Sequence, residues 1–156
     1  MTDVRRWGAL VGMLALGCFA IVASSASGGP AIRFVAAVEL RPDGGSAARG
    51  AAYFTQRGAR LSGWVVVWGL PPRSSHAVHF HGPAGTCASK PAKPPQAAHR
   101  DLVADDRGVA FQRFTVTSES QVLRRGFYYN VHEHPSAHGT SPSIVCGVIR
   151  PLQVRG

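Results

Sequence analysis

Short segments in which apolar and polar residues alternate run along most of this chain, and a period of two is typical of strands with one buried face. The clearest segment is 59–70, ARLSGWVVVWGL, which two prolines follow. On a strand, Trp64 and Trp68 share one face, and Val65 and Val67 take the other. We therefore predict a strand here, with the two valines in a core.

Six other short segments are bounded by glycine, proline or aspartate and have strand-like composition. Imperfect alternation of apolar residues in the segment 108–118 predicts a bulge near Arg113. Residues 118–126 are predicted to contain a short helical turn, and residues 83–99 form a loop without periodicity, of a length that is usually functional or disordered. The six predicted strands are 32–40, 50–56, 76–82, 108–118, 127–134 and 143–152.

The strand spacing and the turn residues predict an all-β fold, either a sandwich or a Greek-key barrel. The chain has 156 residues, with 18 glycines and 11 prolines spread along it. That length fits one compact domain, which we place at residues 32–152. Because a small barrel fills its interior with side chains, a functional site is expected outside it, under loops.

The N-terminus has the organisation of an export signal. Arg5 and Arg6 precede an apolar segment, residues 7–23, and small residues follow it. We predict a signal peptide over 1–26, a linker over 27–31, and an extracytoplasmic location (periplasmic, cell-surface or secreted). The apolar segment is short for a membrane span, which needs about 20 residues. Retention as an N-terminal membrane anchor is the alternative.

The formal net charge is +9. The arginines are scattered, without a Lys/Arg run or a nucleic-acid-binding motif, so nucleic acid is not an expected partner. A solvated basic surface is the simplest interpretation, and electrostatic steering of a small anion is the second.

Removal of a signal peptide would leave two cysteines, Cys87 and Cys146. In an exported protein two cysteines are most simply one disulfide, and two free buried thiols are the alternative. A disulfide here would close a loop of about 60 residues, which chain entropy makes worth about 4 kcal/mol.

Three histidines form the strongest chemical signal. His79 and His81 lie two apart on a predicted strand and project together, whereas Val78 and Phe80 point to the core. His132, at the end of another apolar strand, is a candidate third nitrogen ligand. Three imidazoles suit copper, zinc, iron or nickel, and the lack of an obvious carboxylate or thiolate favours copper or zinc.

Four motifs, read in order along residues 32–152, resemble the copper/zinc superoxide dismutase family. That resemblance implies an eight-stranded Greek-key barrel, a copper site outside it and an intrachain disulfide between Cys87 and Cys146. The motifs are HAVHFH (76–81), HRDLVADDRGVA (99–110), VHE (131–133) and CGVI (146–149).

By the same resemblance, His79, His81 and His132 match three copper ligands of the family. His76 matches a histidine that binds no metal but braces the copper site by hydrogen bonding. It is thus a residue of the supporting shell.

The chain also departs from the family pattern. The resemblance expects a histidine bridging copper and zinc where this chain has Lys93, an aspartate where it has Ser136, and an active-site arginine where it has Ser143. Of the zinc motif only His99 and Asp101 remain, with altered spacing. We therefore expect copper as the cofactor and no zinc site, with Asp101 in a supporting position.

The fourth copper ligand stays open at this point. His99 is the first candidate, and His134, His138 and water are the others.

The expected function is that of an exported copper-only superoxide dismutase, acting on the superoxide anion, with a homodimer as one option. Two alternatives remain. One is a non-enzymatic extracytoplasmic copper-binding or copper-buffering protein. The other is a structural β domain, because the segments 79–84 and 128–135 also resemble the CHRD domain.

Overall fold

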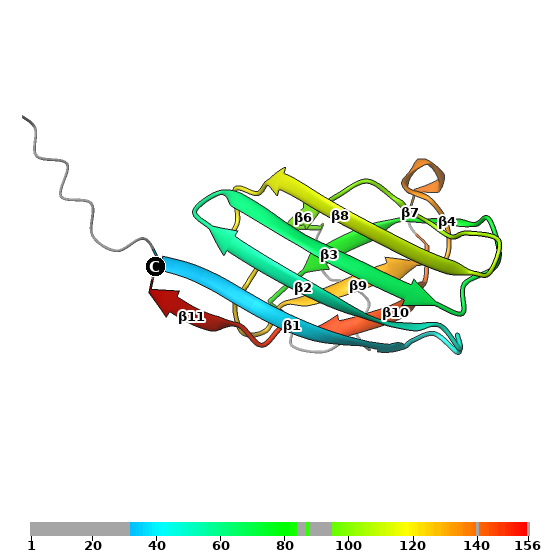
Figure 1. The fold of residues 1–156 in the computed structure, drawn as a ribbon, viewed down its shortest axis with the longest axis horizontal. Coiled ribbons are helices and arrows are strands. Elements are labelled where there is room, and N and C mark those ends of the chain that lie inside the picture. Colours follow the sequence, from blue (N-terminus) through cyan, green and yellow to red (C-terminus); the bar gives the residue numbers. More distant parts are fainter. Residues whose placement is uncertain (1–31, 84–86, 88–94, 140, 156) are drawn as a thin grey trace, which may run out of the picture.

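A computed structural model describes residues 32–83, 87, 95–139 and 141–155 of the chain (Figure 1). The predicted signal peptide, residues 1–26, and the linker 27–31 lie outside the described residues. Within the described part, no helix is long and apolar enough to cross a membrane.

The described residues form strands and one short 3₁₀ helix, η1 (Ser136–His138). The strands are β1 (Ile32–Pro42), β2 (Arg49–Arg57), β3 (Arg60–Trp68), β4 (Ser75–His76), β5 (Val78–His81), β6 (Ala97–Ala98), β7 (Leu102–Val103), β8 (Val109–Thr117), β9 (Tyr128–His132), β10 (Ser143–Val148) and β11 (Leu152–Arg155).

All of these strands except β4 and β7, which pair with each other, form a nearly closed antiparallel sheet in the order β6-β5-β9-β10-β1-β2-β3-β8, with β11 paired to β1. Figure 1 shows β8, β3, β2 and β1 side by side, with β9 and β10 behind them. The chain passes from β3 to β5 and from β8 to β9, and neither pair of strands is adjacent in the sheet. These two connections therefore cross from one side of the barrel to the other. The predicted all-β barrel is confirmed.

Aromatic side chains from both sides of the barrel meet in its core. The Phe54 ring from β2 lies with its centroid 4.9 Å from that of Phe80 on β5 and 5.1 Å from that of Tyr129 on β9. All three are 0% exposed. Val65 and Val67 are equally buried, as their alternation on β3 predicts. The interior is therefore filled, and a functional site has to lie on the outside.

Gly147 allows the close approach of β10 to β1. A Cβ atom there would lie 2.4 Å from Cγ1 of Val38 and 2.7 Å from Cδ2 of Leu40. Any side chain at this position would push the two strands apart.

Two local predictions are wrong. The pairing of β3 with β8 runs without a register shift from Arg60↔Thr117 to Trp68↔Val109, so there is no bulge near Arg113. The apparent slip arises because Phe111 points outward and is 59% exposed. Residues 118–126 contain no helical turn; buried Gln56 binds this segment by accepting from the backbone N–H groups of Val122 and Leu123.

The outer face of β2 and β3 carries an aromatic surface. Tyr53 and Trp64 are register partners with stacked rings, and Trp68 lies further along β3 with 41% of its surface exposed. These three side chains line an open groove of about 710 Å³.

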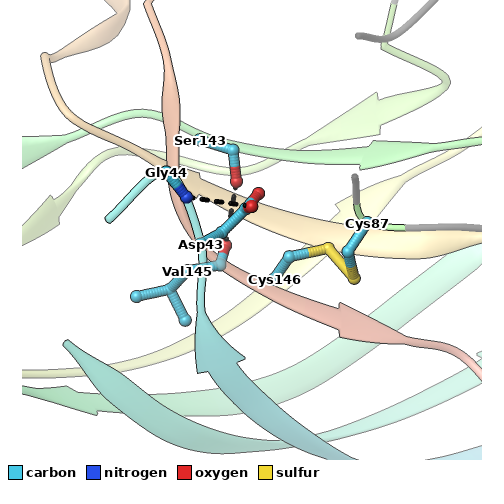
Figure 2. The surroundings of a disulfide bond; sticks show 6 residues. All are labelled: Asp43, Gly44, Cys87, Ser143, Val145 and Cys146. Atoms are coloured by element: carbon cyan, nitrogen blue, oxygen red, sulfur yellow. Dashed lines mark hydrogen bonds between the residues drawn. A yellow bond between two sulfur atoms is a disulfide. The ribbon is translucent and has the colours of Figure 1, made fainter. Parts of the chain in front are cut away.

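Cys87 and Cys146 form a disulfide, with Cα atoms 5.7 Å apart, which confirms the predicted pair. Figure 2 shows the bond beside the turn that carries Asp43 and Gly44, where the Gly44 N–H donates to the Asp43 carboxylate. The disulfide attaches the segment after β5 to the middle of β10. Most of that segment, residues 84–86 and 88–94, lies outside the described residues.

Replacing Phe54 by alanine should lower the free energy of unfolding by about 3–5 kcal/mol, because it removes the central ring of the core. Phe111→Ala is the matched control, since the same substitution at an exposed site should change stability by about 0.5 kcal/mol or less. Urea unfolding followed by circular dichroism measures both. Equal losses in the two variants would contradict the assignment of Phe54 to the core.

Reducing the disulfide should lower the stability of the metal-free protein by about 4 kcal/mol, because the bond closes a loop of 59 residues in the unfolded chain. The measurement is the urea midpoint with and without a reductant. The double variant Cys87→Ser, Cys146→Ser should match the reduced protein and no longer respond to the reductant. An unchanged midpoint on reduction would show that the bond adds nothing to stability.

Candidate metal centre

The antiparallel pairing of β5 with β9 brings the histidines together. Val78 pairs with Val131, and both are fully buried, so these residues set the inner face of the two strands. The alternation of side chains then places His79 and His81 of β5 on the outer face, together with His132 of β9. The core fixes this arrangement, because a slip of one residue would turn the valines outward.

His79, His81 and His132 form one cluster in which the nearest ligand atoms all lie within 4.8 Å of one another. Nδ1 of His79 donates a hydrogen bond to Nε2 of His132 at 3.1 Å, and an ion shared by the two rings would take the place of that proton. With metal–nitrogen bonds of about 2.0–2.1 Å, that separation corresponds to an angle of about 100° at a shared ion. His81 and His132 are buried and His79 is half-buried, so the rings are held at the barrel surface by their surroundings.

The donor set fits a metal ion. Three imidazole nitrogens suit copper or zinc, and no carboxylate or cysteine of the described residues belongs to the cluster. Two ligand atoms of one ion with bonds of this length are at most about 4.2 Å apart, so at least one ring moves inward by a fraction of an ångström on binding. The structure thus presents a site that can bind a metal, without showing which one.

His132 is oriented by a hydrogen bond on the side of its ring away from the cluster. Its Nδ1 atom lies 2.8 Å from the carbonyl oxygen of Ser141, an acceptor, so Nδ1 carries the proton and donates. Nε2, which faces His79, is then unprotonated and can bind a cation.

His76 supports the same ligand through its backbone. Its ring is 1% exposed, and Nδ1 donates to the carbonyl oxygen of His132 at 2.7 Å. The other ring nitrogen lies 2.6 Å from the hydroxyl of Ser74. His76 contacts no other ring of the cluster, which agrees with a bracing role and not with a role as a ligand.

The local electrostatics favour the neutral form of His79. Burial lowers the pKa of His79 below its usual value, and the nearby His132 lowers it further, whereas the Asp101 carboxylate acts in the opposite direction. A neutral imidazole has the free lone pair that a metal needs, so less free energy is lost to deprotonation when a cation binds.

The structure does not bring His99 into the cluster, contrary to its prediction as a fourth ligand. Its Nδ1 lies 2.9 Å from the carbonyl oxygen of Arg100, and its Nε2 lies 2.8 Å from the hydroxyl of Tyr129. The ring stacks on Phe114 with centroids 4.0 Å apart. His99 is thus packed against the core, with both ring nitrogens engaged.

The remaining sequence candidates do not belong to the cluster either, although the Asp101 carboxylate is near enough to act on the pKa of His79. The carboxylate of Asp101 accepts hydrogen bonds from the backbone N–H and hydroxyl of Ser136, and so holds η1 in place. His134 and His138 are exposed and lie near each other, with centroids 6.0 Å apart. Lys93, at the position where the family resemblance expects a bridging histidine, lies outside the described residues.

Two buried polar residues beside the histidines were missed from the sequence. Tyr128 and Asn130 have the same strand parity as His132, so they share its outer face, and each is 1% exposed. The rule that paired His79 with His81 would have found both residues had it been applied to YYNVH.

Comparison of the sequence with models of known protein families and with curated proteins finds no match.

The pH dependence of stability should contain a contribution from His99. Burial lowers its pKa to about 4, against about 6.5 in the unfolded chain. Below pH 6.5 the unfolded state binds a proton that the folded state does not, so stability falls as the pH drops. The full effect between pH 6.5 and 4 is on the order of 3 kcal/mol.

The measurement compares urea unfolding of the wild type and His99→Gln, both metal-free with chelator present, between pH 7.5 and 4. The stability difference between the two proteins should shrink as the pH falls. A difference that stays constant with pH would contradict the shifted pKa.

Proposed function

We propose that this protein binds copper through His79, His81 and His132 and uses it to convert superoxide into oxygen and hydrogen peroxide. The observation that carries the proposal is the cluster itself, in which three imidazole nitrogens face one another on the outside of a filled barrel. The order of the motifs along the chain, which resembles the copper/zinc superoxide dismutases, supports the choice of metal and reaction.

Bound copper would supply one-electron chemistry, so that one superoxide is oxidised to oxygen and a second, with two protons, is reduced to hydrogen peroxide. The chain's own residues hold and shape the site. Ser141 fixes the ring of His132, and His76 fixes its backbone. With no histidine at position 93 to deliver a proton, both protons come from solvent.

The charge of the chain supports an anionic substrate. The sequence has a net charge of +9, of which the predicted signal peptide contributes only +1, so the rest of the chain is strongly basic. That charge draws anions toward the surface and raises their rate of encounter, an effect that weakens as ionic strength rises. We therefore infer an enzyme whose attraction for superoxide depends on the whole surface and not on one arginine; that it acts outside the cytoplasm rests on the predicted export signal.

One observation favours the alternative of copper binding without dismutation. Ser143 is the register partner of His132, at the position where the resemblance expects an active-site arginine. Its hydroxyl donates to the carbonyl oxygen of Val145, so this position brings no positive charge to the cluster. A copper-binding or copper-buffering protein needs no such charge.

The test loads the full chain with copper and measures bound metal and superoxide decay on the same samples. The wild type should bind one copper ion per chain and accelerate decay. His81→Ala and His132→Ala should lose at least tenfold in copper affinity together with the activity. His138→Ala, an exposed histidine outside the cluster, is the matched control and should behave as the wild type.

The alternatives give different results in the same experiment. Stoichiometric copper without accelerated decay would support the copper-buffering protein. Failure of the wild type to bind copper would leave the histidines a structural role, as the CHRD-like interpretation holds.

A further inference from the structure

Asn130 occupies the centre of the outer face that carries the three histidines. It is the register partner of His79, while Tyr128 lies opposite His81 at one end of the paired strands. At the other end, the His132 N–H donates to the carbonyl oxygen of Ala77. Along the strands, Asn130 therefore lies at the level of His79, midway between the levels of His81 and His132. Successive outward positions on a strand are about 6.6 Å apart.

Asn130 thus lies at the level along the strands where an ion shared by the three histidines would lie. An ion bound by all three histidines must lie between the level of His81 and the level of His132. These levels are two outward-facing positions apart along the strands, and His79 lies midway between them. The ion must therefore lie close to the level of His79. Paired residues in a sheet have Cβ atoms about 5 Å apart, within reach of a short carboxamide. No other residue of β9 faces that point.

The carboxamide oxygen of Asn130 is also left without a partner. The residue is 1% exposed, and among the described residues its Oδ1 accepts no hydrogen bond. A buried carbonyl without a partner is unfavourable by about 1–3 kcal/mol, so such groups usually have a ligand, a water molecule or an ion to satisfy them. On its other side Asn130 is the partner of Cys146, whose disulfide contributes no strong donor.

The other candidates for a fourth donor fit less well. Both ring nitrogens of His99 are engaged by Arg100 and Tyr129. The Tyr128 hydroxyl also lacks a partner among the described residues, but Tyr128 lies at the level of His81, two steps from His132.

We propose that Asn130 supplies its carboxamide oxygen as the fourth donor of the metal site, giving three nitrogens and one oxygen. The proposal rests on metal binding by the three histidines, but not on dismutase activity. It assigns the unpartnered oxygen a role in holding a cation of the copper or zinc class.

The key variant is Asn130→Leu, which keeps the shape of the side chain and removes the donor. With the full chain, copper(II) and cobalt(II) affinities are measured by competition against a chelator of known affinity. Asn130→Leu should lower the affinity for both ions 10- to 100-fold, and the visible spectrum of the cobalt protein should change with the loss of a ligand. Asn130→Asp keeps an oxygen donor and should bind at least as tightly as the wild type.

Thermal unfolding of the metal-free proteins separates this role from a structural one. Because Asn130→Leu removes a buried oxygen without a partner, the metal-free variant should unfold at the same temperature as the wild type or a few degrees higher. Added metal should then stabilise the variant less than the wild type. Gln112→Leu, which removes a buried carboxamide beside His99, is the matched control and should leave both affinities unchanged.

The two proposals fail in different ways. A wild type that binds neither ion overturns the metal site and this proposal with it. A wild type that binds metal, with affinities and a cobalt spectrum unchanged in Asn130→Leu, overturns only the role of Asn130. Metal-free Asn130→Leu that unfolds well below the wild type would show a structural amide, and would also overturn it.

Discussion

The pairing of β5 with β9 is the constraint on which the candidate site depends. Val78 and Val131 pack inward against the filled core, and the pleat of the sheet then turns His79 and His132 outward on adjacent strands. The free energy that holds the imidazoles together therefore comes from apolar burial on the opposite face. The site needs no interactions of its own strong enough to gather three rings, because the barrel has already placed their Cα atoms.

A buried residue on a strand fixes the outward direction of its two neighbours, and this explains what could be predicted from the sequence. Alternation assigned the inner and outer faces of residues 59–70 and of the HAVHFH segment, because a period of two depends only on local backbone geometry. The disulfide between Cys87 and Cys146 could be predicted because these are the two cysteines that follow the predicted signal peptide. The site residues on those strands could be found for the same reason, since each one lies at a fixed parity from a buried neighbour.

Predictions that depended on long-range contacts were less successful. His99 has the sequence context of a zinc ligand, but it packs on Phe114 and bonds Tyr129, which lie 15 and 30 residues further along the chain. The imperfect alternation of residues 108–118 was assigned to a bulge, but it arises because Phe111 points to solvent; hydrophobic character alone does not fix a side chain's face. Alternation along YYNVH could have placed Asn130 on the outer face, but its unsatisfied oxygen is a property of the folded surroundings and cannot be seen in its sequence neighbours.

The aromatic surface of β2 and β3 has a practical consequence for spectroscopy. Trp64 and Trp68 lie on the outside of one wall of the barrel, and the histidine cluster lies on the outside of the other, with the packed core between them. Two stacked sheets are about 10 Å apart, and side chains on both outer faces add to that separation. Tryptophan fluorescence from this wall, and the ligand-field absorption of a copper or cobalt ion once loaded into the cluster, would thus be two optical signals from opposite sides of the molecule. Watching them together in one sample distinguishes local disturbance of the cluster from collapse of the whole barrel.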